Sequence, residues 1–163
     1  MNDKLAILYF EVTDLWKRFC EEHNMLFNVT CDEYTLLLSS QLDLLEEKLI
    51  EKNEIILRIG ILENIRRDLI IELNSIMIGS EIDSVSKLIE IMRTYEVEKN
   101  QKHLFRFNAL LIDVIEKIQA QNKRNQLFIN KALISLKQIR IEATGKKNYS
   151  SYTSSGSATS SST

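Results

Sequence analysis

The stretch Ile50–Ile70, IEKNEIILRIGILENIRRDLI, places apolar residues around more than one side of a helix. At about 100° per residue, its main apolar group covers roughly half of the circumference, which is wider than the ~100° stripe that one packing partner requires. This group is Ile55, Ile56, Ile59, Leu62, Ile65, Leu69 and Ile70, and the far side carries Leu57, Ile61 and the adjoining Ile71. We therefore expect this helix to have several partners, some of them outside this chain.

The composition is that of one ordinary globular domain. Of 163 residues, 44% are hydrophobic and 27% are charged, which is enough to bury a core. The formal charge of −2 provides no concentrated basic face for nucleic acid or anionic lipid. The apolar start LAILYF is far shorter than the ~20 apolar residues of a membrane span and lacks the features of a signal peptide. Two cysteines in so long a chain fit a reducing cytoplasm. We expect a cytoplasmic protein that is not embedded in a membrane.

Long helices are the expected secondary structure. Proline is absent and only four glycines occur, so little forces the backbone out of a helix. Apolar residues recur at steps of three and four, and the strand pattern of strict alternation is missing. The predicted helices run from about Asp3 to Leu38, from about Gln41 to Met77, over SVSKLIEIMR at residues 84–93, and from about Leu104 to Gly145. The predicted fold class is all-α, an elongated antiparallel helix bundle or coiled coil with three long helices and one short helix.

The predicted helix ends depend on a few polar residues and one glycine. Ser40 can accept a hydrogen bond from the first amides of the second helix, and Asp43 suits the positive end of that helix dipole. Gly79 can adopt the left-handed conformation that ends a helix, and Ser80 or Asp83 can cap the helix that follows.

The end of the chain has a different composition. The segment NYSSYTSSGSATSSST has almost no apolar surface to offset an ordering entropy of roughly 1–2 kcal/mol per residue. We therefore expect a helical domain over residues 1–143 and a disordered, flexible Ser/Thr-rich tail over residues 144–163.

Catalytic and metal-binding patterns are mostly missing. No GxGxxG or GxxxxGK[ST] motif is present. His23 and His103 lack the glutamate three residues earlier that a di-iron bundle requires. Cys20, His23 and Cys31 could suggest zinc ligands, but Cys20 falls on an apolar stripe and is better explained as a small hydrophobic residue. The acidic residues of LLEEKLIEKNE alternate with basic ones on a polar face. We expect no enzymatic activity, no metal and no cofactor.

The order of these features resembles the FlgN family of flagellar export chaperones. The resemblance covers about residues 1–142 and is carried by EYTLLLSSQLDLLEEKL, EKNEII, LENIRRDLI and the pattern N..N.LF..KAL..L. The family also tends to end in a segment Tyr-x-x-x-Gly, which Tyr152-Thr-Ser-Ser-Gly156 matches. Beyond Gly156 the chain departs from that pattern with a run rich in serine and threonine.

The resemblance implies a chaperone that binds the C-terminal helical segments of the hook-associated proteins FlgK and FlgL, prevents their premature assembly and delivers them to the export gate. Surplus apolar surface could hold such a client helix in a groove. The apolar stripe of the last helix, interrupted by the polar QAQNKRNQ, provides candidates for this groove, although bundle core is the alternative explanation of each residue. The predicted client-binding residues are Leu111, Val114, Ile118, Phe128, Ala132 and Leu136.

The resemblance also implies that the tail contacts the gate, with Tyr152, and Tyr149 as the second candidate, expected to bind the cytoplasmic domain of the export-gate protein FlhA. Composition alone favours the interpretation of both tyrosines as incidental linker residues. Two other functional classes remain open at this point. One is a coiled-coil structural or adaptor protein that self-associates, for example as a homodimer. The other is an enzyme or metalloprotein with a site in the bundle core, against which the missing ligand motifs argue.

Overall fold

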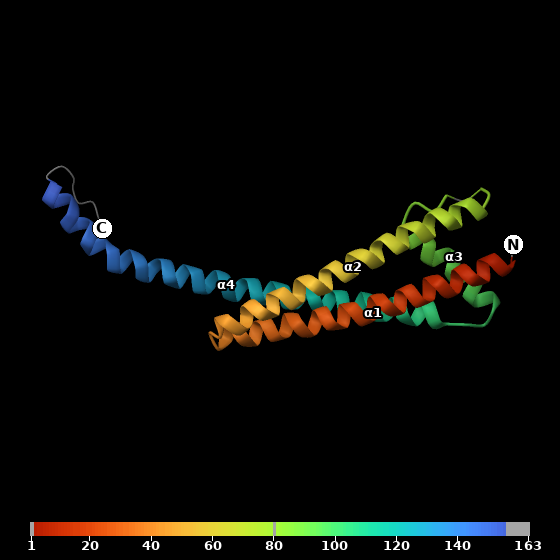
Figure 1. Cartoon of the computed structure of the whole chain (residues 1–163), viewed down its shortest axis with the longest axis horizontal. Helices are drawn as coiled ribbons and strands as arrows, with labels where there is room; N and C mark the ends of the chain where they lie inside the picture. Colours follow the sequence, from red (N-terminus) through yellow and green to blue (C-terminus); the bar gives the residue numbers. More distant parts are fainter. Residues whose placement is uncertain (1, 80, 156–163) are drawn as a thin grey trace. The chain divides into compact units, whose positions relative to one another are not determined.

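The computed structural model describes the backbone of residues 2–79 and 81–155 and the side chains of residues 3–79 and 81–144. Every regular element in these ranges is a helix (Figure 1). The helices are α1 (Asn2–Leu38), α2 (Leu42–Ile76), α3 (Val85–Glu98) and α4 (His103–Ser155). This confirms the predicted all-α class with three long helices and one short helix. The chain divides into two compact units, unit 1 with residues 1–122 and unit 2 with residues 123–163.

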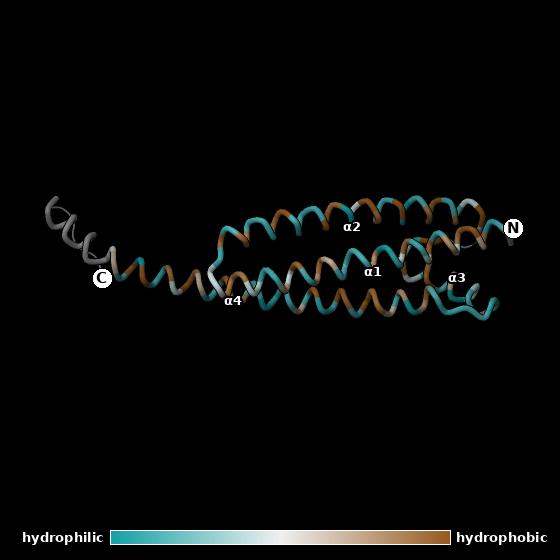
Figure 2. Tube along the Cα trace, turned by 60° about the horizontal axis from the view of Figure 1, so that its bottom comes forward, coloured by the Kyte–Doolittle hydropathy of each residue, from teal (hydrophilic) through white to brown (hydrophobic). Residues whose placement is uncertain are grey.

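Unit 1 is an antiparallel bundle. α1 and α2 form a helical hairpin, and the part of α4 that belongs to unit 1 runs in the same direction as α1 (Figure 1). Polar contacts hold α1 to α4: Trp16 Nε1 donates to Asn108 Oδ1 at 3.0 Å, and Cys20 Sγ donates to the Phe107 carbonyl at 3.2 Å. Apolar and polar residues alternate along each helix of this unit (Figure 2).

The core of unit 1 is built from one face of each helix, as the steps of three and four require. On α2 the fully buried residues are Ile55, Leu62, Leu69 and Leu73. Leu57, Ile61 and Ile71 on the same helix are 70%, 58% and 68% exposed. The main apolar group therefore packs inside unit 1 except for Ile56, which is 47% exposed, and the far side of α2 stays uncovered there. Other core residues are Leu8, Tyr9, Val12, Leu15, Trp16, Phe19, Cys20, Ile82, Leu88, Met92, Leu104, Leu111, Val114 and Ile118.

The connection between α1 and α2 corrects one predicted cap. Ser40 has a positive φ of 54°, and the Gln41 amide donates to the Leu36 carbonyl while the Ser40 amide donates to the Leu37 carbonyl. This is the hydrogen-bond pattern of a Schellman motif. Ser40 therefore ends α1 and does not cap α2, whose N-cap residue is Gln41, without a side-chain hydrogen bond.

In the connection between α2 and α3, Gly79 behaves as predicted, whereas the residue that caps α3 differs from the prediction. Gly79 has a φ of +100°, as predicted for a residue that ends a helix. The cap of α3 is Ser84, whose hydroxyl accepts from the Lys87 amide at 3.3 Å, and not Asp83; Ser80 lies outside the described residues. The Asn74 side chain both donates to the Ile82 carbonyl and accepts from its amide, at 3.0 and 2.7 Å. This pairing fixes the chain just before Ser84.

The ends of α3 and α4 also differ from the prediction. α3 continues past Arg93 to Glu98, so the first half of residues 94–103, which separate the two predicted helices, is helical. α4 continues through Gly145 to Ser155. The residues of the predicted tail beyond that point, 156–163, lie outside the described residues.

Candidate interaction surface

Unit 2 combines a helical backbone with many exposed aliphatic side chains. All of its described residues belong to α4, so within this part of the unit no second helix covers them. A single helix of this kind is marginally stable in water, because most helical stability in proteins comes from packing of an apolar face. The exposed large apolar residues, between 53% and 62% exposed, are Leu127, Leu133, Ile134, Leu136, Ile139 and Ile141.

Most of these apolar residues fall into two stripes on roughly opposite sides of α4, at about 100° per residue. The first, the heptad stripe, repeats every seven residues at Leu127, Ile134 and Ile141. The second, the continuing stripe, follows the spacing of the core residues of α4 in unit 1. Its members are Phe128, Ala132, Leu136 and Ile139.

The residues predicted from sequence to bind a client divide between the two units. Leu111, Val114 and Ile118 are 9%, 4% and 6% exposed and belong to the core cluster of unit 1. Their side chains are not accessible to a partner in this structure. The other three predicted residues belong to the continuing stripe of unit 2.

In unit 2, Phe128 and Ala132 are half-buried and Leu136 is 62% exposed. The side chains of Tyr149 and Tyr152 lie outside the described residues. The structure thus brings together three of the predicted client-binding residues along one side of a helix. Sequence reasoning missed the heptad stripe, whose exact seven-residue spacing was the available signal.

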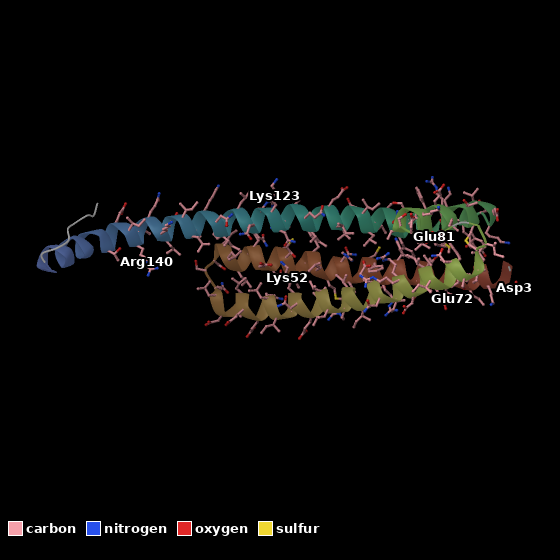
Figure 3. The ribbon with its side chains drawn as sticks, turned by 90° about the horizontal axis from the view of Figure 1, so that it is seen from above. Asp3, Lys52, Glu72, Glu81, Lys123 and Arg140 are labelled. Carbon is pink, nitrogen blue, oxygen red and sulfur yellow. The ribbon has the colours of Figure 1, made fainter. Side chains whose placement is uncertain are left out.

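A polar cluster lies inside unit 1 where α2 meets α1 and α4. Lys52 Nζ donates to Glu33 Oε2 at 2.8 Å and to Asn122 Oδ1 at 3.2 Å. The side chains of Lys52 and Glu33 are only 17% and 11% exposed. Figure 3 labels Lys52 on α2. Because breaking a buried ion pair leaves an uncompensated charge, this cluster favours one alignment of the three helices. Asn122 belongs to the segment QAQNKRNQ, so the polar interruption of the stripe has a structural role here.

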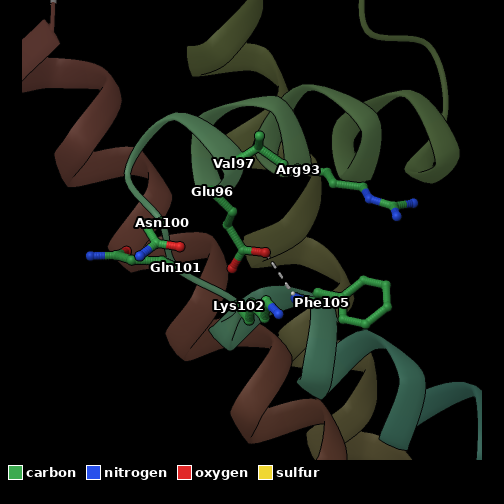
Figure 4. Close-up of a pocket in the computed structure, with 7 residues that line it drawn as sticks. All are labelled: Arg93, Glu96, Val97, Asn100, Gln101, Lys102 and Phe105. Atoms are coloured by element: carbon green, nitrogen blue, oxygen red, sulfur yellow. Dashed lines mark hydrogen bonds between the residues drawn. The ribbon is translucent and has the colours of Figure 1, made fainter.

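A second polar cluster positions the start of α4. Glu96 on α3 is 2% exposed, and its carboxylate accepts hydrogen bonds from the Leu104 and Phe105 amides at 2.5 and 3.1 Å (Figure 4). It therefore caps the N-terminus of a helix that it does not belong to, where a negative charge is favoured. The Tyr9 hydroxyl also donates to this carboxylate. Burial, and then the hydrogen bond to Glu96, raise the pKa of Tyr9 to about 12.

Beside Glu96 is a pocket of about 360 Å³. Arg93 lies with its guanidinium 5.1 Å from the centre of the Phe105 ring, and Lys102 also lines this pocket (Figure 4). The Glu96 carboxylate accepts hydrogen bonds from Tyr9 and from two α4 amides, so these bonds give it a structural role. The pocket is best explained as the outer side of the α3–α4 connection.

Neither a metal-binding cluster nor a membrane-spanning helix occurs among the described residues. Nowhere in them do three or more histidine, cysteine, aspartate or glutamate side chains gather so that they could hold a metal ion. Cys20 is buried in the core of unit 1, consistent with its interpretation as a small hydrophobic residue. None of the helices in these ranges combines the length and the apolar character needed to cross a membrane.

Comparison with known proteins identifies the family. No curated protein and no solved structure matches the chain. The family model described as FlgN protein, in contrast, matches residues 1–160, which is nearly the whole sequence. The match agrees with the helical bundle and with the sequence patterns described above. The chain therefore belongs to the FlgN family, a family of flagellar export chaperones.

Proposed function

We propose that this chain is a cytoplasmic, non-enzymatic chaperone that binds the C-terminal helical segments of the hook-associated proteins FlgK and FlgL. The observation that supports this most directly is the continuing stripe of α4, in which Leu136 and Ile139 are 62% and 61% exposed. An amphipathic helix can lay apolar anchors at i, i+3 or i+4, and i+7 along such a stripe. A client helix bound in this way is not available to assemble with other copies of itself.

The six predicted client-binding residues have two roles in this proposal. Phe128, Ala132 and Leu136 contact the client. Leu111, Val114 and Ile118 are core residues that hold α4 within unit 1 and so support the helix that carries the contact residues. Burial of one leucine side chain contributes ~1.5–3 kcal/mol, so a few contacts suffice for a client that must later be released.

Delivery to the export gate is assigned to the end of the chain. Tyr152, within Tyr152-Thr-Ser-Ser-Gly156, binds the cytoplasmic domain of FlhA, and Tyr149 is the second candidate. An aromatic ring has a large contact area and only two side-chain torsions to order, and its hydroxyl can find a partner at the rim of a pocket. Neither tyrosine belongs to unit 1, whose core the fold depends on.

The client site is tested by the affinity of the full chain for purified FlgK and FlgL C-terminal segments. Leu136→Asp is expected to weaken binding at least about tenfold, since a tenfold change corresponds to 1.4 kcal/mol, and to leave the helix content unchanged. Leu110→Asp is the matched control, because Leu110 lies on the same helix and is 59% exposed. Unchanged client affinity in Leu136→Asp would place the groove elsewhere. Leu111→Asp introduces a charge into the core and is expected to unfold unit 1.

The gate contact is tested with Tyr152→Ala in two assays, client affinity and affinity for the FlhA cytoplasmic domain. Loss of gate binding with intact client binding supports the division of roles. Equal gate binding by the wild type, by Tyr152→Ala and by a chain truncated after Gly145 would contradict it.

Self-association is a second candidate function, favoured by the heptad stripe. Apolar residues at a seven-residue spacing match one of the two apolar positions of a coiled-coil heptad, and Leu127, Ile134 and Ile141 are all more than half exposed. Sedimentation velocity over a range of concentrations distinguishes the two functions. A stable homodimer that Ile134→Asp dissociates, together with no binding of FlgK or FlgL segments, would favour a structural or adaptor protein.

A further inference from the structure

Charge is distributed unequally between the two units. Residues 123–163 contain seven lysines and arginines and one acidic residue, Glu142, which gives a net charge of +6. The whole chain has 21 basic and 23 acidic residues, so residues 1–122 hold 14 and 22 of them, a net charge of −8. The overall value of −2 therefore conceals a basic segment attached to an acidic bundle.

The basic side chains of the described part of unit 2 are exposed and unpaired. They are Lys123, Arg124, Lys131, Lys137 and Arg140, of which Figure 3 labels the first and the last. Among the described residues none of the five forms an ion pair, whereas Lys48, Lys52, Arg58 and Arg66 of α2 all do. Their charge is available to a partner.

These residues lie beside the apolar stripes of α4. At about 100° per residue, Arg124 and Lys131 fall between the heptad stripe and the continuing stripe on one side of the helix. Lys137 and Arg140 fall between them on the other side. Each stripe is therefore bordered by positive charge along both edges. Long basic side chains can also lay their methylene stems along a bound apolar surface while the charge stays in water.

We infer that the segment 123–144 binds an amphipathic helix that carries acidic residues beside its apolar positions. This inference rests on the proposed function, because it names the chemistry of the client segment that the continuing stripe receives. Apolar anchors supply most of the affinity, and the charges set the orientation of the client, accelerate its association and disfavour helices with basic borders.

The arrangement of the stripes distinguishes this partner from an anionic lipid surface. A helix that lies in a membrane interface has one apolar face and one polar face. The segment 123–144 instead has apolar stripes on opposite sides, so a flat surface could cover only one of them. A client helix occupies only the continuing stripe, and the heptad stripe on the other side stays accessible to a second helix.

The inference is tested with the full chain and two synthetic amphipathic helices that share the same apolar residues. One peptide has glutamate at the positions beside the apolar stripe, and its twin has glutamine there. We expect the glutamate peptide to bind at least about tenfold more tightly at low ionic strength, and the difference to shrink strongly near 1 M salt, where the screening length falls to about 3 Å. Equal affinity for the two peptides overturns the inference.

A matched pair of double variants locates the effect. The double variant Lys131→Glu with Lys137→Glu is expected to lose at least about tenfold in affinity for the glutamate peptide. The control is Arg106→Glu with Lys117→Glu, which changes the net charge by the same amount on the part of α4 in unit 1. We expect this control to keep the affinity of the wild type. Equal losses in both variants would assign the effect to the charge of the whole chain and overturn the inference. Binding to vesicles of phosphatidylserine and phosphatidylcholine without binding to the glutamate peptide would also overturn it, in favour of a lipid surface.

The same variants distinguish failure of this inference from failure of the proposed function. If FlgK and FlgL segments bind equally well to the wild type and to Lys131→Glu with Lys137→Glu, the inference fails and the proposed function stands. If those segments do not bind while the glutamate peptide does, the proposed function fails and the acidic helix comes from another protein.

Discussion

Glu96 shows how much a single buried side chain can organise. Its carboxylate accepts hydrogen bonds from two amides at the start of α4, which have no partner within their own helix. It also accepts a hydrogen bond from the Tyr9 hydroxyl of α1. Three helices thus meet at one charged group that is 2% exposed. A buried charge is costly unless it is paired or hydrogen-bonded, and here one of the donors, Tyr9, lies 87 residues before Glu96 in the sequence.

Replacement of Glu96 by glutamine should destabilise unit 1. The loss of a charged acceptor leaves buried donors without an adequate partner, for which about 2–3 kcal/mol is a typical cost. Urea unfolding followed by circular dichroism measures this change in the free energy of unfolding. Glu98→Gln, on the exposed side of the same helix, is the control and should fall within about 0.5 kcal/mol of the wild type. Equal stability of the two variants would mean that Glu96 is not the organising group.

Tyr9 should make stability depend on pH in the alkaline range. Its pKa is raised from 10.0 to about 12 in the folded chain, mainly by burial and then by the hydrogen bond to Glu96. Folding therefore favours the protonated phenol, and this contribution is fully present below pH 10 and is lost as the pH rises toward 12. The difference in ultraviolet absorbance titration between the wild type and Tyr9→Phe isolates this group. A midpoint near 10 would contradict the buried contact.

At the scale of the element, the connection between α1 and α2 carries a residue in an unfavourable conformation. Ser40 has a φ of 54°, in the left-handed region that costs a residue with a Cβ roughly 1–2 kcal/mol. The Schellman hydrogen bonds at this helix end hold it there. The conformation is what allows α2 to begin two residues later and return along α1.

Ser40→Gly should therefore stabilise the hairpin, by up to about 1 kcal/mol, because glycine adopts a positive φ without steric cost. Ser39→Gly is the neighbouring control. Ser39 donates its hydroxyl to the Thr35 carbonyl and does not have a positive φ, so glycine there should destabilise. Thermal unfolding midpoints of the two variants should move in opposite directions, and movement in the same direction would contradict this account.

The sequence predicts the helices well and their caps poorly. Steps of three and four without proline place α1 and α2 within one residue of their observed ends, because tens of residues contribute to that signal. A cap depends on one residue and one local conformation. Three residues are suitable N-cap residues by type: Ser40, Asp83 and Ser84. Which of them caps a helix depends on the path of the chain on either side of it.

The site is predictable only in part for a related reason. The stripe on α4 is visible in the sequence, but its periodicity is the same where it is core, at Leu111, and where it is exposed, at Leu136. Whether another helix covers a stripe is a tertiary property. Glu96 is missed altogether, because the polar run EVEKNQKH gives no local sign that Tyr9 lies beside it.

At the scale of the whole molecule, the two units differ in what holds them together. The buried residues of the core cluster all lie between Leu8 and Ile118, within unit 1. Unit 2 supplies exposed aliphatic residues and positive charge instead. This division fits the proposed function, in which unit 1 is the stable scaffold and unit 2 binds the client.

A chain truncated after Asn122 should still fold, because it retains the whole core cluster. We expect helical circular dichroism and a single cooperative transition in urea for residues 1–122, together with loss of binding to FlgK and FlgL segments. Absence of a cooperative transition would show that the core is insufficient without the rest of α4. Retained client binding would move the client surface to the exposed face of α2.

The alkylation rates of the two cysteines of α1 can be used to measure how often the bundle opens. Cys20 is buried with its thiol against the Phe107 carbonyl, and burial, then the nearby Glu21 charge, raise its pKa, so little reactive thiolate forms. Cys31, eleven residues further along, is only half-buried. Alkylation should therefore modify Cys31 quickly and Cys20 only when α4 separates from α1. The ratio of the two rates, followed by mass spectrometry with and without client, would measure how far binding restrains that separation.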